Sequence, residues 1–383
     1  MAAINTDVDS SVRSLFSVKD YFVTEDGAAE YKVGYDARSA HNFLRLLDLL
    51  KVPDYSAQLY GEPGAATLVV VKNQPPPKPQ QAARLSTPAF LFLLSLLSVF
   101  VTGYVLAVVY PKIAPGSSVL GMGLGFAASL IAVFVLRFLA QQYTAKRGRF
   151  SGLSYYLPNV PLFITIPVMY FIPTFGAVSF PASPPANRNK LFDFYLLGAL
   201  VIVAVAALVS ILGATSSVVL TQAQVAALST ANQTLTMQGY PSLLQNGLLS
   251  LAQDEGLLGQ VPAGGTVMLS PIEMAAWIIF VLAFFNMLPA GLFDGGRMSR
   301  LALGEKGSRV TTVLSGAFLL LADLPNYWVA FLLVFLMAAF PVQGETLDSI
   351  SGLSRSRKAL FAFVVAIGLL CAPVPQSFAT LPL

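Results

Sequence analysis

The sequence predicts a polytopic α-helical membrane protein of about seven transmembrane helices, preceded by a small N-terminal α/β domain. Of its 383 residues, 55% are hydrophobic and only 11% are charged, whereas soluble globular proteins carry about a quarter charged residues. The mean hydropathy is +0.69, and long apolar segments recur after residue 88. The net charge of +4 does not indicate nucleic-acid binding, because basic cytoplasmic loops of membrane proteins give the same balance.

The N-terminal domain is expected to span residues 1–72 and to have the order hairpin, helix, hairpin. Tyr31, Val33 and Tyr35 alternate as in a strand, and Asp36 is expected to cap the helix that follows. Two further strands are predicted over 55–60 and 66–72. No apolar core of a signal peptide occurs in residues 1–20, so we expect this domain to be cytoplasmic. The proline-rich stretch 73–87 reads as a semi-rigid linker.

The transmembrane domain is expected to span residues 88–383. Its apolar segments are 88–110, 117–142, 191–213, 271–292, 309–323, 326–341 and 358–373. Lysine and arginine follow the second and fourth segments and precede the seventh, whereas the loop 214–270 contains neither. The positive-inside rule therefore predicts a cytoplasmic N-terminus, an extracytoplasmic loop 214–270 and an extracytoplasmic C-terminus.

The stretch 150–185 is apolar but is interrupted by prolines, among them Pro158, Pro161, Pro167, Pro173 and Pro181, so it does not read as a simple transmembrane helix. Pieces that favour β-structure, such as Tyr155 and Tyr156, lie between the breaks. We predict a re-entrant or membrane-embedded β-hairpin. The alternative is an interfacial loop.

Residues 286–297, Asn-Met-Leu-Pro-Ala-Gly-Leu-Phe-Asp-Gly-Gly-Arg, form the stretch around which the chain is organised. They place an amide, a helix-breaking proline and the carboxylate of Asp294 inside an apolar segment. A carboxylate costs several kcal/mol in hydrocarbon, so Asp294 is a candidate functional residue. The alternative is a helix that ends at the membrane interface, with Asp294 in water.

This stretch resembles the second signature of the site-2 protease family of intramembrane metalloproteases (M50), in which the aspartate is a zinc ligand. The resemblance is to the archaeal and chloroplast branch that includes the ethylene-dependent gravitropism-deficient and yellow-green proteins, and it extends from about residue 17 over most of the chain. Further matches are 170–178 (Tyr-Phe-Ile-Pro-Thr-Phe-Gly-Ala-Val), 187–193 (Asn-Arg-Asn-Lys-Leu-Phe-Asp), 347–351 (Leu-Asp-Ser-Ile-Ser) and 355–357 (Arg-Ser-Arg). The resemblance implies a site-2-protease-like core, with the hairpin over an active-site cleft.

The zinc motif that the resemblance implies is absent. Such an enzyme needs two histidines one helical turn apart, with a glutamate beside the first as general base. The chain has one histidine, His41, which we expect on the surface of the N-terminal helix. The resemblance aligns Arg137 with the first histidine, Phe138 with the glutamate and Gln141 with the second histidine. Anchoring the alignment on Gly148 instead shifts it by one residue, and neither register restores a ligand or the base. The resemblance also places Arg297 and Ser270 where relatives often carry histidine.

We therefore expect no catalytic residues and no metal ligands, but a set of vestigial active-site positions. These are Arg137, Phe138, Gln141, Asn286, Pro289, Asp294, Gly295 and Gly296. A buried carboxylate without its metal needs a cation, and the Arg137 guanidinium could supply one. The alternative is that Arg137 extends to the cytoplasmic interface.

The sequence favours a proteolytically inactive homologue that binds or regulates membrane-protein segments through a retained intramembrane cleft. No bound cofactor is expected, and the expected partners are the lipid bilayer and transmembrane segments of other proteins, with no nucleic acid. The alternative is an active intramembrane zinc metalloprotease with ligands that the pattern does not reveal. A transporter is disfavoured, because no internal inverted repeat is visible.

Overall fold

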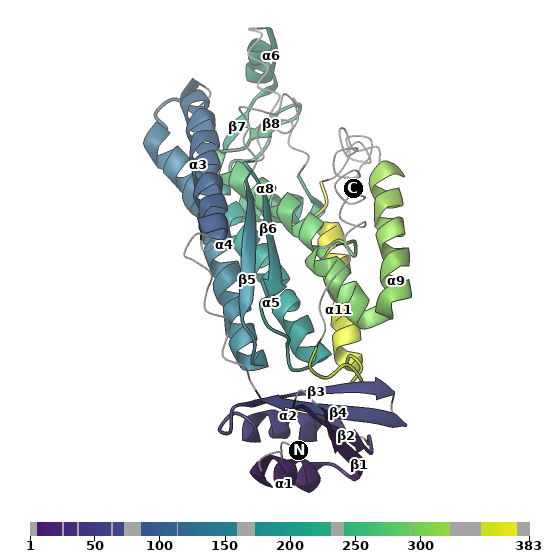
Figure 1. The fold of residues 1–383 in the computed structure, drawn as a ribbon. Helices are drawn as coiled ribbons and strands as arrows, with labels where there is room; N and C mark the ends of the chain where they lie inside the picture. The colour runs from purple at the N-terminus through teal and green to yellow at the C-terminus, as the bar shows by residue number, and fades with distance from the viewer. Residues whose placement is uncertain are drawn as a thin grey trace.

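The computed structural model describes residues 6–24, 27–36, 38–62, 64–72, 86–112, 114–158, 173–230, 241–291, 293–321 and 346–373. A sheet with two helices forms one end of the molecule, and a bundle of long helices rises from it (Figure 1). Most of the predicted linker 73–87 and the whole predicted span 326–341 lie outside the described residues.

The N-terminal part is a four-stranded antiparallel sheet that packs on two helices. Its elements are α1 (Thr6–Leu15), β1 (Val18–Val23), β2 (Ala29–Val33), α2 (Ser39–Leu49), β3 (Tyr55–Glu62) and β4 (Ala65–Lys72). The strand order is β1-β2-β4-β3, so the chain has the predicted order of hairpin, helix and hairpin. Tyr31, Phe43 and Leu68 are fully buried between the sheet and the helices. Helix α1 was not predicted, because its apolar residues are few.

Asp36 does not cap helix α2, which corrects the sequence-based expectation. The helix begins at Ser39, and its N-cap residue Arg38 makes no side-chain capping bond. Asp36 Oδ1 instead accepts hydrogen bonds from the Arg38 N–H (2.9 Å) and from Ser39 Oγ (2.7 Å). The aspartate therefore fixes the turn before the helix, and β2 ends at Val33, before Tyr35.

Three helices in the described part of the chain are long and apolar enough to cross a membrane. They are α3 (Ser86–Val109), α4 (Val119–Gly148) and α5 (Arg188–Ala214). They correspond to the predicted segments 88–110, 117–142 and 191–213, and their ends differ from the prediction by one to three residues, except that α4 continues from 142 to 148. The continuation of helix α4 beyond the end of the predicted apolar segment consists of two final turns that are polar and basic. Its C-cap Arg149 has a left-handed backbone (φ 64°).

The later helices are shorter or bent. Helix α8 (Pro271–Met287) has 17 residues, nearly all buried, and α11 (Arg355–Leu370) has 16. Helix α9 (Asp294–Leu321) breaks at Gly304, whose φ of 76° favours glycine, and turns back on itself. A hydrogen bond of 2.8 Å between the hydroxyls of Ser299 and Thr311 joins its two arms. The predicted segment 309–323 is therefore mostly the second arm, and the total of seven membrane spans stays a prediction.

The proline-interrupted stretch forms a β-hairpin in its described residues. Strand β5 (Gly152–Pro158) pairs antiparallel with β6 (Thr174–Pro181), and the predicted pieces between 159 and 172 lie outside the described residues. At the end of the molecule opposite the N-terminal sheet, the segment 214–270 forms β7 (Val218–Leu220), α6 (Gln222–Thr230), α7 (Leu243–Asp254) and β8 (Thr266–Met268) (Figure 1). A short 3-10 turn, η2 (Tyr110–Lys112), ends α3.

The N-terminal sheet is joined to the helical bundle through the 347–349 segment. Leu59 of β3 donates its N–H to the Leu347 carbonyl and accepts from the Ser349 N–H, while Leu347 and Asp348 donate to the carbonyls of 185 and 186. The backbone ladder thus runs from β3 through 347–349 to the start of α5. The side chains of Arg149 and Asp48 also form an ion pair across this junction.

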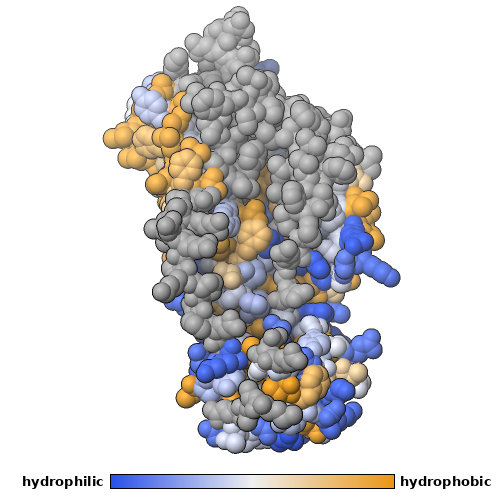
Figure 2. Space-filling model, viewed as in Figure 1, coloured by the Kyte–Doolittle hydropathy of each residue, from blue (hydrophilic) through white to orange (hydrophobic). Residues whose placement is uncertain are grey.

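The described surface of the helical bundle is more apolar than that of the N-terminal part. Figure 2 shows apolar side chains gathered at the ends of α3 and α4 that lie away from the N-terminal sheet, and mostly polar side chains with some apolar ones over the N-terminal sheet and helices. Phe90, Leu93 and Leu97 of α3 are each about three-fifths exposed, at 62%, 62% and 59%. Such a contiguous apolar surface suits hydrocarbon rather than water.

Candidate functional site

The end of helix α8 and the start of α9 fold tightly against each other. Asn286 stays within the helix, where its Nδ2 donates to the Leu282 carbonyl (2.8 Å), and the half-buried Pro289 follows the break. A Cβ added at Gly295 would lie 2.2 Å from the Met287 carbonyl oxygen, and one at Gly296 would lie 2.5 Å from Ala290 backbone atoms. The close packing of the two backbones therefore leaves no room for a side chain at Gly295 or Gly296. It also fixes the position of Asp294, the residue just before them.

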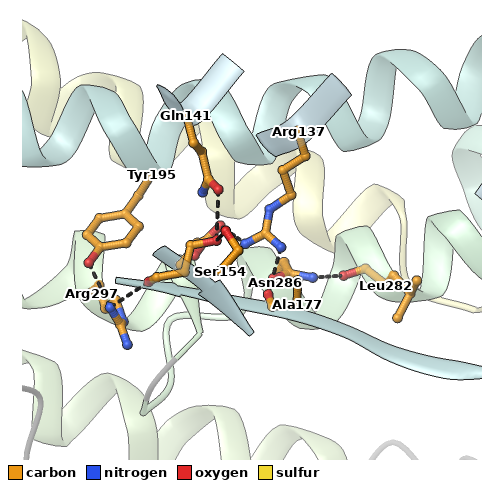
Figure 3. A network of polar contacts seen from close by, with 10 residues as sticks. Arg137, Gln141, Ser154, Ala177, Tyr195, Leu282, Asn286 and Arg297 are labelled. Carbon is orange, nitrogen blue, oxygen red and sulfur yellow. Dashed lines mark hydrogen bonds and ion pairs between the residues drawn. The ribbon is translucent and has the colours of Figure 1, made fainter. Parts of the chain in front are cut away.

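Arg137 and Asp294 form a buried ion pair. Arg137 Nη2 lies 2.8 Å from Asp294 Oδ2, and the two side chains are 4% and 2% exposed. Arg137 comes from the middle of α4 and points toward β6, as Figure 3 shows. The structure thus contains the pairing expected from the sequence, whereas the alternatives with either side chain in interfacial water are wrong.

Two arginines bind the same edge of strand β6. Arg137 Nη1 donates to the Ala177 carbonyl (2.6 Å), and Arg297 Nη1 donates to the Ser179 carbonyl (2.8 Å). Carbonyls two residues apart in a strand point to the same side, where a further strand would otherwise pair. The two guanidiniums take the place of that strand. Arg297 is also held by the Tyr195 hydroxyl (2.7 Å) and lies over the ring of Phe180.

A chain of neutral hydrogen bonds lies beside the ion pair. Ser179 Oγ donates to Gln141 Oε1 (2.7 Å), and the hydroxyls of Ser179 and Ser154 are 3.0 Å apart. Gln141 is 1% exposed and packs against Gly198 of α5, where a Cβ would lie 2.7 Å from its Nε2. Phe138 is 38% exposed. Of the three residues aligned with the zinc motif, two therefore point inward and one does not.

Three members of this site were not predicted from the sequence: Ser154, Ser179 and Tyr195. The serines belong to a hairpin whose register cannot be read from a proline-rich stretch. Tyr195 lies in the first turns of α5, on the face that carries the buried Leu191 and Phe194. A tyrosine among buried apolar residues of a helix is the sequence pattern that could have indicated Tyr195, since a buried tyrosine hydroxyl usually has a hydrogen-bond partner.

With this geometry in view, the relationships of the chain become informative. Residues 74–322 match the model of peptidase family M50. The chain belongs to this family. It is therefore an integral membrane protein, and the likeness seen in the Asp-Gly-Gly stretch is confirmed.

The curated relatives are plant proteins named as probable zinc metalloproteases. The chain is 29% identical to probable zinc metalloprotease EGY1, chloroplastic, of Arabidopsis thaliana, over 43% of this chain and 29% of the relative. It is 29% identical to probable zinc metalloprotease EGY2, chloroplastic, of Oryza sativa subsp. indica, over 36% of this chain and 25% of the relative. The chain thus spans less than a third of the length of these relatives. No solved structure matches.

The groups around Asp294 do not fit the zinc ion that the names of the relatives imply. Zinc in proteins is bound by histidine, cysteine and carboxylate groups. The group that binds Asp294 is the Arg137 guanidinium of α4, and the polar groups beside this pair on β6 are the Arg297 guanidinium and the Gln141 carboxamide, which both bind Ser179. Within the described part of the chain, no three His, Cys, Asp or Glu side chains cluster. His41 is exposed on α2, and Ser270 caps α8.

Proposed function

We propose that this M50 homologue does not cleave peptide bonds and acts instead by binding or regulating transmembrane segments of other membrane proteins. The observation that carries the proposal is the buried Arg137–Asp294 pair, with a separation of 2.8 Å. A guanidinium is permanently charged and is never a zinc ligand. It can therefore neutralise the aspartate, but it does not bring a metal ion that could activate water for peptide hydrolysis. The residue aligned with the catalytic glutamate is Phe138, which cannot act as a base.

The proposal extends to the kind of partner. An intramembrane protease must hold its substrate as an extended strand before cleavage, and a free strand edge is the usual way to do so. The edge of β6 nearest Asp294 is filled by Arg137 and Arg297. A partner segment would therefore bind here as a helix against apolar surface rather than as an unwound strand.

Zinc content together with cleavage of a model transmembrane substrate tests this proposal. The purified chain should hold well under one zinc per molecule and leave the substrate intact, and Asp294→Asn should change neither result. Stoichiometric zinc that is lost in Asp294→Asn would establish the active-protease alternative.

A restored variant provides the matched control. Arg137→His, Phe138→Glu and Gln141→His together rebuild the two imidazoles and the general base on α4 beside Asp294. This triple variant should gain zinc, and the gain should disappear when Asp294→Asn is added. Failure of the well-folded triple variant to bind zinc would mean that the positions are not a former metal site.

We also propose that the N-terminal sheet is cytoplasmic and the segment 214–270 extracytoplasmic. Arg149, Arg188 and Arg355 lie at the end of the bundle that faces the N-terminal sheet, and α6, β7 and β8 lie at the other end. Impermeant reagents added outside should label cysteines introduced at Gln222, and should label those introduced at Arg355 only after permeabilisation. Labelling of both positions from one face would contradict this orientation.

A further inference from the structure

Three polar side chains meet inside the molecule at the end of α8 that lies far from Asp294. Glu273 of α8 accepts hydrogen bonds at Oε1 from Ser210 Oγ of α5 (2.7 Å) and from Gln245 Nε2 of α7 (2.7 Å). Their exposed fractions are 0%, 1% and 0%. This cluster joins α7, within the segment 214–270, to the two central helices of the bundle.

Two oxygens of the cluster have no donor. Glu273 Oε2 and Gln245 Oε1 are both buried without a hydrogen-bond partner among the described residues. If the carboxyl is ionised, both atoms can only accept, and each would be an unsatisfied buried acceptor. A proton on Glu273 Oε2 that donates to Gln245 Oε1 satisfies both atoms at once. Acid and carboxamide would then exchange two hydrogen bonds in a closed ring.

The local sequence shows that Glu273 is diverted from an ordinary role. Residues 270–273, Ser-Pro-Ile-Glu, have the spacing of a capping box, in which the glutamate would accept from the backbone N–H of the serine. Ser270 does cap the helix, since its Oγ accepts from the Glu273 N–H (3.1 Å). The Ser270 N–H, however, donates to Ser217 Oγ (3.0 Å). The carboxyl of Glu273 is thereby left to α5 and α7.

The surroundings offer no counter-charge for a carboxylate. A Cβ at Gly213 of α5 would lie 2.6 Å from Glu273 Oε2, so the helix backbone covers this oxygen. The polar groups that act on Glu273 are Ser210 from α5 and Gln245 from α7, and no charged side chain does so among the described residues. Two titratable groups from the packed elements are uncharged near neutral pH: Tyr110, after α3, donates to the Ser216 carbonyl just beyond α5, and Cys371, after α11, is buried in the hydrophobic core that includes α8. Arg137 and Arg297 lie beyond the other end of α8, because Arg137 pairs with Asp294 and Arg297 is in the first turn of α9. Asn286, near that end of α8, is about 20 Å along the helix axis from Glu273.

We propose that Glu273 is a proton-binding site: its neutral acid, paired with Gln245 and Ser210, holds α7 against the bundle. Loss of the Oε2 proton to solvent removes the hydrogen bond from Oε2 to Gln245 Oε1 and leaves a charged oxygen facing an acceptor oxygen, while Oε1 still accepts from Ser210 and from Gln245 Nε2. Helix α7 then separates from α5 and α8 so that water can reach the charge. The segment 214–270 is thereby held or released according to pH.

Hydrogen exchange of α7 tests the proposal on the full chain in lipid nanodiscs, between about pH 6 and about pH 9. Glu273→Gln is the matched control, because its carboxamide keeps both hydrogen bonds to Gln245 and cannot ionise. At low pH the two proteins should exchange alike over residues 243–254. Above the titration point the ratio of wild-type to variant exchange should rise by up to about tenfold per pH unit, since each unit multiplies the ionised fraction by ten.

A ratio that stays constant over the pH range would overturn the proposal, as would protection of the wild-type protein by sodium ions at high pH, which would indicate a cation in place of the proton. An infrared measurement covers the case in which Glu273→Gln fails to fold. The carbonyl stretch of a protonated carboxyl group should be present in the wild-type protein and should shift in Gln245→Leu. Absence of that band at neutral pH would also overturn the proposal.

Discussion

Two carboxyl groups bracket helix α8, and the protein treats them differently. Asp294, just beyond the C-terminal end, is paired with the permanent cation of Arg137, and Glu273, in the first turn, meets only the neutral groups of Ser210 and Gln245. Both are at most 2% exposed. The comparison separates two ways of burying a carboxyl group: one supplies a counter-charge, and the other supplies neutral hydrogen-bond partners.

Each carboxyl also depends on a glycine that lets two backbones approach. Gly213 of α5 allows the backbone of Glu273 to come so near that a Cβ would lie 2.5 Å from its nitrogen. Gly295 does the same for the turn before Asp294. The two sites therefore share their packing and differ in charge. Variants that change one property at a time can separate these contributions.

The largest effect is expected from breaking the ion pair on one side only. Arg137→Leu leaves Asp294 buried without its cation and should lower the free energy of unfolding by about 3–5 kcal/mol. Adding Asp294→Leu should recover much of that loss, because no charge is then left uncompensated. A double-mutant cycle on thermal or denaturant unfolding in detergent measures the difference.

Glu273→Gln is the counterpart at the other end of the helix. It preserves neutral hydrogen bonding, so it should change the unfolding free energy at neutral pH far less than Arg137→Leu does.

Additive effects of Arg137→Leu and Asp294→Leu would show that the two side chains do not interact, and the contrast between the ends of α8 would fail.

A smaller loss is expected from adding one methyl group at the packed glycines. Gly295→Ala and Gly213→Ala each force a Cβ into backbone atoms, and such overpacking typically costs about 1–3 kcal/mol. Gly247→Ala in α7 is the control, because its Cβ would meet nothing within 4 Å and alanine favours a helix. Equal stability of the three variants would mean that the close approaches relax easily.

The sequence alone predicts much of the site at Asp294, and the reasons are physical. A carboxylate in an apolar segment demands a cation, and the resemblance to the site-2 protease family placed Arg137 at the position that faces it. The long apolar helices could also be predicted, because a run of about twenty apolar residues is characteristic of a membrane-spanning helix. What could not be read was the register of the β5–β6 hairpin, and therefore Ser154 and Ser179, since strand pairing is set by contacts distant in sequence.

Glu273 illustrates a second limit. Its spacing from Ser270 reads as a capping box, and only the structure shows that Ser217 takes the expected backbone hydrogen bond. Gln245, its partner, lies 28 residues earlier, in the segment that the sequence predicts only as an extracytoplasmic loop. Pairings across such distances depend on how α7 docks, which local patterns do not encode.

A third carboxylate, Asp48, provides the exposed reference for the comparison and the smallest expected effect. It forms an ion pair with Arg149 across the junction between the N-terminal sheet and α4, and its side chain is 53% exposed. The hydrogen bond from the Arg149 guanidinium lowers the pKa of this carboxyl below its ordinary value, while partial burial opposes the shift.

Because the pKa of Asp48 is lower in the folded state, the ion pair contributes stability at pH values above about 4, where an unfolded aspartate is ionised. That contribution should disappear as the pH falls through the folded-state pKa. Solvent screening limits it to a fraction of a kcal/mol, so Asp48→Asn should shift the unfolding midpoint slightly at neutral pH and not at all in strong acid. A pH series of thermal unfolding, repeated at high salt, checks this. A shift as large as that of Arg137→Leu would mean that exposure does not separate this pair from the buried one.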